Sequence, residues 1–345
     1  MSGRGCLVHK VKIPQNLSLR NAINFCNRLW ELGHHDEYAF DFVNLGLVEP
    51  FTMAYVANEL KRFRASKPDS KFTALNHRDK TYAAHMGFFQ AFGLKFGNEP
   101  GEASGSSTYL PLTILKVKDL EQEANQTYEH VGNVIETRAE RISKILTRQE
   151  SGDLVDTLTF SIREIIRNVV EHSESEIVEY CAQYWPSKKL VELAVLDTGT
   201  GVMKGLSSNP YLKIEDERDA LHLALLPGIS GKMFKGVKKR RDDEWQNSGF
   251  GLYMTSRICR NGGDFFIASN DKSLFLDRNS KQDIECNYLG TALRLRIDTS
   301  KISTYSEMLA QYRTEGYAAA KKFSGKDAIE PSVASTMLAR DFKEG

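Results

Sequence analysis

The chain has few cysteines and no long apolar run. Its five cysteines show no paired spacing, which argues against a disulfide framework and indicates reduced, mostly buried thiols. No apolar run approaches the ~20 residues that a membrane helix needs, and residues 1–15 lack the apolar core of a signal peptide. We therefore expect a soluble, cytoplasmic protein without a membrane partner.

A large excess of charge of either sign is also absent. The 46 basic and 45 acidic side chains leave a formal net charge of +1, which argues against a nucleic-acid-binding or membrane-binding field over the whole protein. The eight histidines and five cysteines show no metal-ligand spacing. The hydrophobic content of 41% and the charged content of 26% are ordinary for globular proteins, and the length favours two domains.

The segment 163–173, with the sequence REIIRNVVEHS, has the pattern of an amphipathic helix. Glu164, Asn168 and His172 recur every four residues and therefore line one side of the helix. An apolar stripe beside them consists of Leu158, Ile162, Ile165, Ile166 and Val169. The polar row should lie at the edge of the core, where a cleft can open. The alternative is an ordinary helix with a solvated Glu and Asn.

The polar residues of this helix suit phosphate chemistry. Magnesium prefers oxygen ligands and keeps several waters while it bridges phosphates, so the Asn168 oxygen could hold it without a carboxylate cage. Glu164, one turn away, is placed to take a proton from a water or hydroxyl that attacks a terminal phosphate. The helix therefore carries a candidate metal ligand and a candidate general base.

The segment 195–202, VLDTGTGV, is typical of a strand that stops at Asp197 and enters a glycine turn. Gly199 and Gly201 permit a tight turn and a close approach of the backbone to a ligand. A carboxylate at the end of a strand can accept a hydrogen bond from an exocyclic amine, which would select adenine. The alternative is a plain Asp-Gly turn.

Two further segments follow in the C-terminal half. Gly249, Gly251 and Leu252 lie in NSGFGLYM (247–254) and precede a predicted helix, where backbone N–H groups can bind phosphate. A Gly-x-Gly pair alone is more often only a turn. The segment 289–297, LGTALRLRI, is a predicted strand that starts with Gly290 and Thr291.

In this order, the four segments resemble the GHKL, or Bergerat-fold, ATPase family. This family includes gyrase and MutL ATPases, histidine kinases and anti-sigma-factor serine kinases. The resemblance covers Asp153 to Ile297, and it implies that Glu164 is the general base and Asn168 the magnesium ligand. The Glu-x-x-x-Asn-x-x-x-His form is most similar to the anti-sigma kinase branch, as is the start of the lid at 219–232.

The resemblance also implies an ATP site and its adenine and phosphate contacts. The adenine box would be formed by Asp197, Gly199 and Gly201, and a threonine near the adenine would be Thr291. The phosphate-facing glycines would be Gly249 and Gly251, next to Leu252. This sequence departs from the family pattern in one place, because GFGL stands where a fuller Gly-x-Gly-x-Gly is common.

A basic run in the predicted lid follows. Six cations crowd residues 232–241, and three acidic residues follow at 242–244: the basic residues are Lys232, Lys235, Lys238, Lys239, Arg240 and Arg241. Like charges in such a run resist packing unless an anion is bound, and ATP would supply one. Contact with nucleic acid stays open for this run, as does a solvated loop. We expect one or two of the cations to reach a phosphate and take Lys232 as the candidate.

Residues 1–96 read as a separate α/β unit. Strand patterns at 6–13, 38–45 and 71–77 alternate with helix patterns at 19–32, 51–63 and 81–96, the last broken near Gly93. Residues 40–60 resemble the STAS domain of anti-sigma-factor antagonists. The serine that the family phosphorylates is absent from the turn at 49–52, so the resemblance implies a fold and partner binding but no phosphate switch. The alternative is a scaffold that packs on the ATPase.

The remaining segments connect and follow these units. Residues 97–150 contain a Gly/Ser-rich linker at 97–107 and one long polar helix or two at 117–149. Two packings are open for this helical part, either against a neighbouring domain or against a second subunit of a homodimer. Residues 299–345 contain a predicted helix and a polar tail.

The sequence as a whole predicts an α/β protein with a STAS-like domain at 1–96 and a Bergerat-fold, two-layer α+β sandwich at 151–298. Its first functional hypothesis is a regulatory protein that binds adenine nucleotide and magnesium, hydrolyses ATP slowly, and controls a protein partner through the order of its lid. The alternatives are a protein serine/threonine kinase and a non-catalytic nucleotide-binding adaptor. A sensor histidine kinase is disfavoured, because His130 is the only candidate phosphoacceptor.

Overall fold

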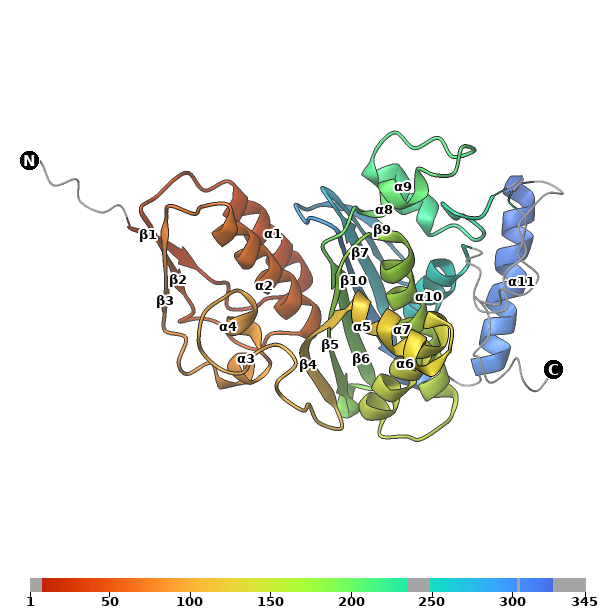
Figure 1. The fold of residues 1–345 in the computed structure, drawn as a ribbon, viewed down its shortest axis with the longest axis horizontal. Helices are drawn as coiled ribbons and strands as arrows, with labels where there is room; N and C mark the ends of the chain where they lie inside the picture. Colours follow the sequence, from red (N-terminus) through yellow and green to blue (C-terminus); the bar gives the residue numbers. More distant parts are fainter. Residues whose placement is uncertain (1–7, 235–236, 238–248, 303–304, 325–345) are drawn as a thin grey trace, which may run out of the picture.

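The computed structural model describes residues 8–234, 237, 249–302 and 305–324. In this part of the chain, helices and strands form a mixed α/β protein with two sheets, a three-stranded sheet and a seven-stranded one (Figure 1). The strand order of the larger sheet is β4-β5-β6-β10-β7-β8-β9. No helix in the described residues has both the length and the hydropathy to cross a membrane.

The N-terminal unit alternates strands and helices, as the sequence predicts. Its parallel sheet consists of β1 (Val8–Lys12), β2 (Glu37–Asp41) and β3 (Lys71–Leu75), and its long helices are α1 (Leu19–Trp30) and α2 (Pro50–Ala65). The predicted helix at 81–96 is instead two short helices, α3 (Thr81–His85) and α4 (Phe88–Ala91). The break lies at Gly87, whose φ of 87° favours glycine over other residues.

The larger sheet is antiparallel and begins earlier than its predicted domain boundary. Its strands are β4 (Tyr109–Lys116), β5 (Ile177–Trp185), β6 (Leu190–Asp197), β7 (Asp264–Ser269), β8 (Lys272–Leu276), β9 (Lys281–Glu285) and β10 (Thr291–Asp298). Strand β4 lies in the predicted linker region and pairs with β5. The predicted strand at 289–297 is β10, which pairs with both β6 and β7.

Helices cover the sheet on one face, and the N-terminal unit covers the other (Figure 1). Side chains of β6 alternate between two cores: Leu193 and Val195 lie with the C-terminal helices, whereas Ala194 and Leu196 lie with the N-terminal unit. Because both faces are covered, the central strands are apolar on both sides, and the N-terminal unit shares one of the two cores with the sheet.

The helices of the C-terminal half can now be assigned. The long ones are α5 (Val117–Thr127), α6 (Val131–Thr147), α7 (Asp153–His172), α10 (Gly251–Arg260) and α11 (Tyr305–Ser324), and the short ones are α8 (Val202–Leu206), α9 (Glu217–Ala224), η1 (Pro186–Lys188) and η2 (Thr299–Lys301). The polar segment 117–149 is thus two helices. Helix α6 packs on α7 of the same chain, so its apolar stripe is already covered.

A buried polar contact joins the N-terminal unit to the sheet. The Glu192 carboxylate on β6 is fully buried and accepts a hydrogen bond of 3.0 Å from the Phe51 N–H at the start of α2. Burial raises the pKa of Glu192, and the nearby Arg294 opposes that shift. Thr52, in the turn that resembles the phosphorylated turn of STAS domains, is fully buried. The start of α2 therefore faces the sheet rather than solvent.

Phe51 provides a test of this shared core. Its ring is fully buried and lies 5.3 Å from the Phe266 ring on β7, so Phe51→Ala leaves a cavity between the two units. We expect a loss of about 3–5 kcal/mol in the free energy of unfolding, measured by urea denaturation. Val43→Ala, at a half-exposed position of the same unit, is the control and should change it by less than about 0.5 kcal/mol. Similar values for both variants would contradict a shared core.

Candidate functional site

One cavity collects most of the predicted site residues. It lies between α7, the turn after β6, α8 and the start of α10, and it holds about 780 Å³ of empty space including its open mouth. The predicted residues that line it are Asn168, Asp197, Gly201, Gly249, Gly251, Leu252 and Thr291. Segments that are far apart in the sequence therefore meet at one place.

Asp197 lies at the end of β6 and is only 2% exposed. Its Oδ1 accepts a hydrogen bond of 2.8 Å from the Gly199 N–H, and Thr291 lies directly opposite on β10. Burial raises the pKa of Asp197 to about 6, and hydrogen bonds from Gly199 and from Thr291 oppose the shift. The cavity thus contains a buried carboxylate held by two neighbours.

The turn after Asp197 is packed too closely for side chains. A Cβ at Gly199 would collide with the Ser173 carbonyl oxygen at the end of α7, and that oxygen also accepts a hydrogen bond of 2.7 Å from the Thr200 N–H. Gly201 has a φ of 84°, and a Cβ there would collide with Asn270. Gly199 does not line the cavity itself; it fixes the turn against α7.

The second pair of glycines forms the opposite wall. Gly249 has a φ of 75°, and a Cβ there would collide with the Ile229 carbonyl. Gly251 is the first residue of α10. The first N–H groups of a helix have no partner within the helix and carry its positive dipole end, so they suit an anion.

Asn168 faces the cavity from the middle of α7. It is half-buried, and its side chain makes no hydrogen bond within the part of the chain that the structure describes. The described residues also contain no cluster of three His, Cys, Asp or Glu side chains suited to a metal. The Asn168 side-chain oxygen could therefore serve as one oxygen ligand for a hard cation that takes its other ligands from elsewhere.

His172 and Lys232 interact electrostatically near the cavity. His172 lines it, and burial lowers the pKa of this imidazole to about 4, helped by the charges of Lys232 and Arg167. The ring is therefore neutral at physiological pH. Lys232 does not line the cavity, and its Nζ donates a hydrogen bond to the Glu171 carbonyl oxygen.

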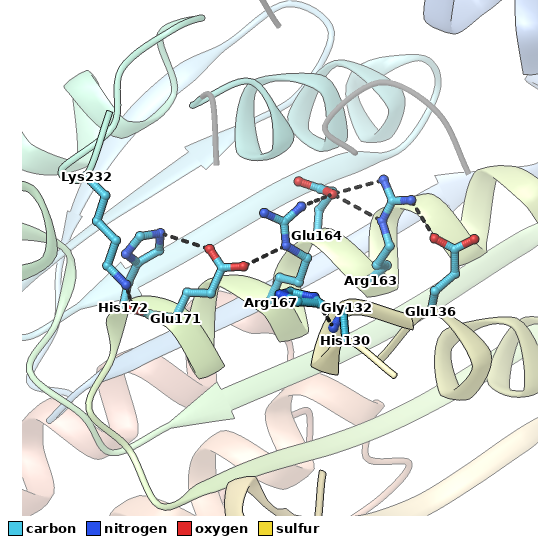
Figure 2. A network of polar contacts seen from close by, with 9 residues as sticks. All are labelled: His130, Gly132, Glu136, Arg163, Glu164, Arg167, Glu171, His172 and Lys232. Carbon is cyan, nitrogen blue, oxygen red and sulfur yellow. Dashed lines mark hydrogen bonds and ion pairs between the residues drawn. The ribbon is translucent and has the colours of Figure 1, made fainter. Parts of the chain in front are cut away.

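Glu164 lies behind the wall rather than in it. Its side chain is buried, and its Oε1 accepts hydrogen bonds from Arg163 Nε at 3.2 Å and from Arg163 Nη2 at 3.0 Å (Figure 2). Arg167 Nη1 lies 3.3 Å from the same oxygen. A Cβ at Gly251 would collide with the other oxygen, Oε2. The carboxylate thus contacts the cavity wall through Gly251.

Sequence reasoning missed a further buried carboxylate near the site, that of Glu217 on α9. Its Oε1 accepts hydrogen bonds of 3.0 Å from the N–H groups of Val202 and Met203 and a further one from Ser269 Oγ. It therefore caps α8 and braces the turn that begins with Gly199. No motif marks Glu217, because its partners lie on the turn and on β7.

Two other predictions concern the lid and His130. The His130 Nδ1 accepts a hydrogen bond of 3.0 Å from the Gly132 N–H, so the ring caps α6 (Figure 2). The cations predicted to surround Lys232 in the basic run, Lys235, Lys238, Lys239, Arg240 and Arg241, lie outside the described residues.

Comparison with known proteins adds no relative. No protein-family model matches the chain, and no curated protein sequence matches it.

The buried charge of Asp197 predicts a pH-dependent change in stability. The pKa is about 6 in the folded protein against an ordinary 3.8, so ionisation above pH 6 costs the folded state on the order of 3 kcal/mol. We expect Asp197→Asn to raise the free energy of unfolding of the ligand-free protein by that amount at pH 7.5. Below pH 6 the gain should shrink, and near pH 4 it should vanish because Asp197 is then protonated when folded.

The measurement is the difference in unfolding free energy between variant and wild type at several pH values. The exposed Asp69 supplies the control variant, Asp69→Asn, which should show no such pH-dependent difference. A loss of stability in Asp197→Asn at pH 7.5 would contradict the account of this carboxylate.

Proposed function

We propose that this chain is an ATP-binding regulatory protein of the GHKL, or Bergerat-fold, type, with a STAS-like N-terminal domain. The observation that carries the proposal is the convergence of Asn168, Asp197, Gly251 and Thr291 on one cavity. These residues come from four separate segments, each with a different part of the chemistry that ATP requires. A chance cavity would not be expected to collect all four.

The adenine would lie against Asp197. An exocyclic amine can donate to the free acceptor capacity of this carboxylate, while guanine presents a carbonyl at the same position. Apolar side chains of Ile165, Val169 and Leu293 also line the cavity and would contact the base. This combination of apolar walls and one buried acceptor is a common way to select a ligand.

The phosphates would lie toward Gly249 and Gly251, at the start of α10. Magnesium, when bound, would neutralise the phosphates, and the Asn168 oxygen would help to hold it. Lys232 is close enough to His172 to influence its pKa, so its charge lies near the cavity. The arrangement supports a slow, magnesium-dependent ATPase whose nucleotide state controls a protein partner.

A second candidate function is a non-catalytic nucleotide-binding adaptor. It is favoured by the position of Glu164, whose Oε1 is held by two arginines and which is absent from the cavity lining. Purified protein with γ-labelled ATP and magnesium separates these functions. Released phosphate supports the ATPase, binding without release supports the adaptor, and a labelled protein band supports a serine/threonine kinase.

Nucleotide selectivity tests the role of Asp197. We expect the wild type to bind ATP well and GTP poorly in calorimetric titrations. Asp197→Asn should weaken ATP about tenfold or more, because a hydrogen bond to a buried charged acceptor is worth roughly 1.5–3 kcal/mol. The control Asp69→Asn should bind ATP like the wild type. Equal affinity of the wild type for ATP and GTP would exclude Asp197 as the adenine-reading residue.

Magnesium dependence tests Asn168 separately. Asn168→Ala should abolish the tightening of ATP binding by magnesium and leave metal-free ADP binding nearly unchanged, because only the metal contact is removed. Asn21→Ala, at an exposed position of the N-terminal unit, is the matched control. If magnesium still tightens ATP binding to Asn168→Ala, another residue holds the metal.

A further inference from the structure

A series of ionisable side chains runs along α7 from the cavity to α6. It joins the neutral His172 to Glu171, Arg167, Glu164, Arg163 and Glu136 (Figure 2). Lys232 joins the series through the Glu171 carbonyl oxygen. Arg163 and Arg167 are almost completely buried. Buried arginines cost free energy unless their partners are well placed, so this series calls for an explanation beyond an amphipathic helix.

Each arginine is held at both ends. Arg163 donates from Nη1 to Glu136 at 2.8 Å and from Nε and Nη2 to Glu164. Arg167 donates from Nε to Glu171 at 2.9 Å and from Nη1 to Glu164. Because a guanidinium is planar with donors in fixed directions, contacts at both ends fix its orientation and therefore the position of the Glu164 carboxylate.

The two oxygens of Glu164 have different surroundings. Three N–H groups of the two arginines donate to Glu164, and all three converge on Oε1. Oε2 accepts no hydrogen bond within the part of the chain described here, and it contacts Gly251 in the cavity wall. Oε1 is thus anchored by the arginines. Oε2 can still accept a hydrogen bond or a proton, and it lies at Gly251, where the phosphates would lie.

We propose that Arg163 and Arg167 are positioning residues for ATP hydrolysis, which hold Oε1 of Glu164 so that Oε2 can act as the general base. This inference rests on the proposed function. It explains why the carboxylate is ion-paired and still placed against Gly251. It also explains why Gly251 lacks a side chain, since a Cβ would occupy the place of Oε2.

The reaction that this arrangement serves is a simple hydrolysis. A water oxygen forms a bond to the terminal phosphorus, and the bond between that phosphorus and the bridging oxygen breaks, so ADP leaves with the bonding electron pair. Glu164 Oε2 accepts a proton of the attacking water and later releases it to solvent. The arginines take no proton and touch no reacting atom.

The test compares turnover with ATP affinity in single variants of the full chain. Glu164→Gln should lower kcat about 10²–10⁴-fold. Arg167→Gln should lower kcat about 10²-fold, the size expected for a misplaced catalytic group. Both variants should keep the ATP dissociation constant within about threefold, because a loss confined to kcat marks an interaction made only in the transition state.

Conservative variants separate positioning from a structural role. Arg167→Lys keeps the charge without the planar fork and should recover part of the lost kcat. Glu136→Gln, at the outer end of the series, keeps its shape and should lower kcat by less than Arg167→Gln. Arg138→Gln, which removes an ion pair with Glu123 on the half-exposed side of α6, is the matched control and should hydrolyse ATP like the wild type.

The outcomes are distinct. Wild-type kcat in Arg167→Gln, or a fall in kcat matched by equal losses of ATP affinity and folded fraction, would overturn the positioning role. A wild type that binds ATP without turnover would overturn it too and leave the ATP-binding proposal standing. A wild type that does not bind ATP would overturn the proposed function itself.

Discussion

The burial of strand β6 on both faces is the constraint on which the rest of the structure depends. One face of the strand packs on the helical layer that forms the cavity, and the other packs on the N-terminal unit. The same strand carries Glu192, which contacts the start of α2, and ends in Asp197 at the floor of the cavity. Because a strand is a stiff element, displacement of the N-terminal unit would disturb the place where the nucleotide is proposed to bind.

The turn after β6 extends this constraint to the helices. Gly199 lets the turn touch Ser173 at the end of α7, and Glu217 braces its other end. Along α7, the arginines fix Glu164 behind Gly251. The cavity is therefore built from backbone held at close range on three sides, which is the kind of preorganised site that fixes a ligand by shape and dipoles.

Some features of the fold could be predicted from the sequence because their signals are local. The helix with Asn168, the turn at Asp197 and the glycines before α10 follow from residue spacing and backbone preference. Strand β4 was missed because it follows a Gly/Ser-rich segment and its partner, β5, lies beyond α5, α6 and α7. The sequence predicts that this linker separates residues 1–96 from the C-terminal domain, whereas the shared core depends on long-range packing that residue spacing does not reveal.

In the site, too, the sequence predicts the residues that share a helix but not the contacts between different elements. Spacing placed Glu164 and Asn168 on one side of α7, but it assigned no role to Arg163 or Arg167. Their role depends on Glu136 from α6 and on the contact of Glu164 with Gly251. Neither contact is visible in a pattern of a single helix.

A crystal structure of the protein with magnesium and a non-hydrolysable ATP analogue would show directly whether the cavity binds nucleotide. We predict the adenine amine within hydrogen-bond distance of Asp197, the metal bound to the Asn168 oxygen, and the phosphates at the start of α10. Nucleotide bound elsewhere, or an adenine that faces away from Asp197 in this cavity, would contradict this prediction.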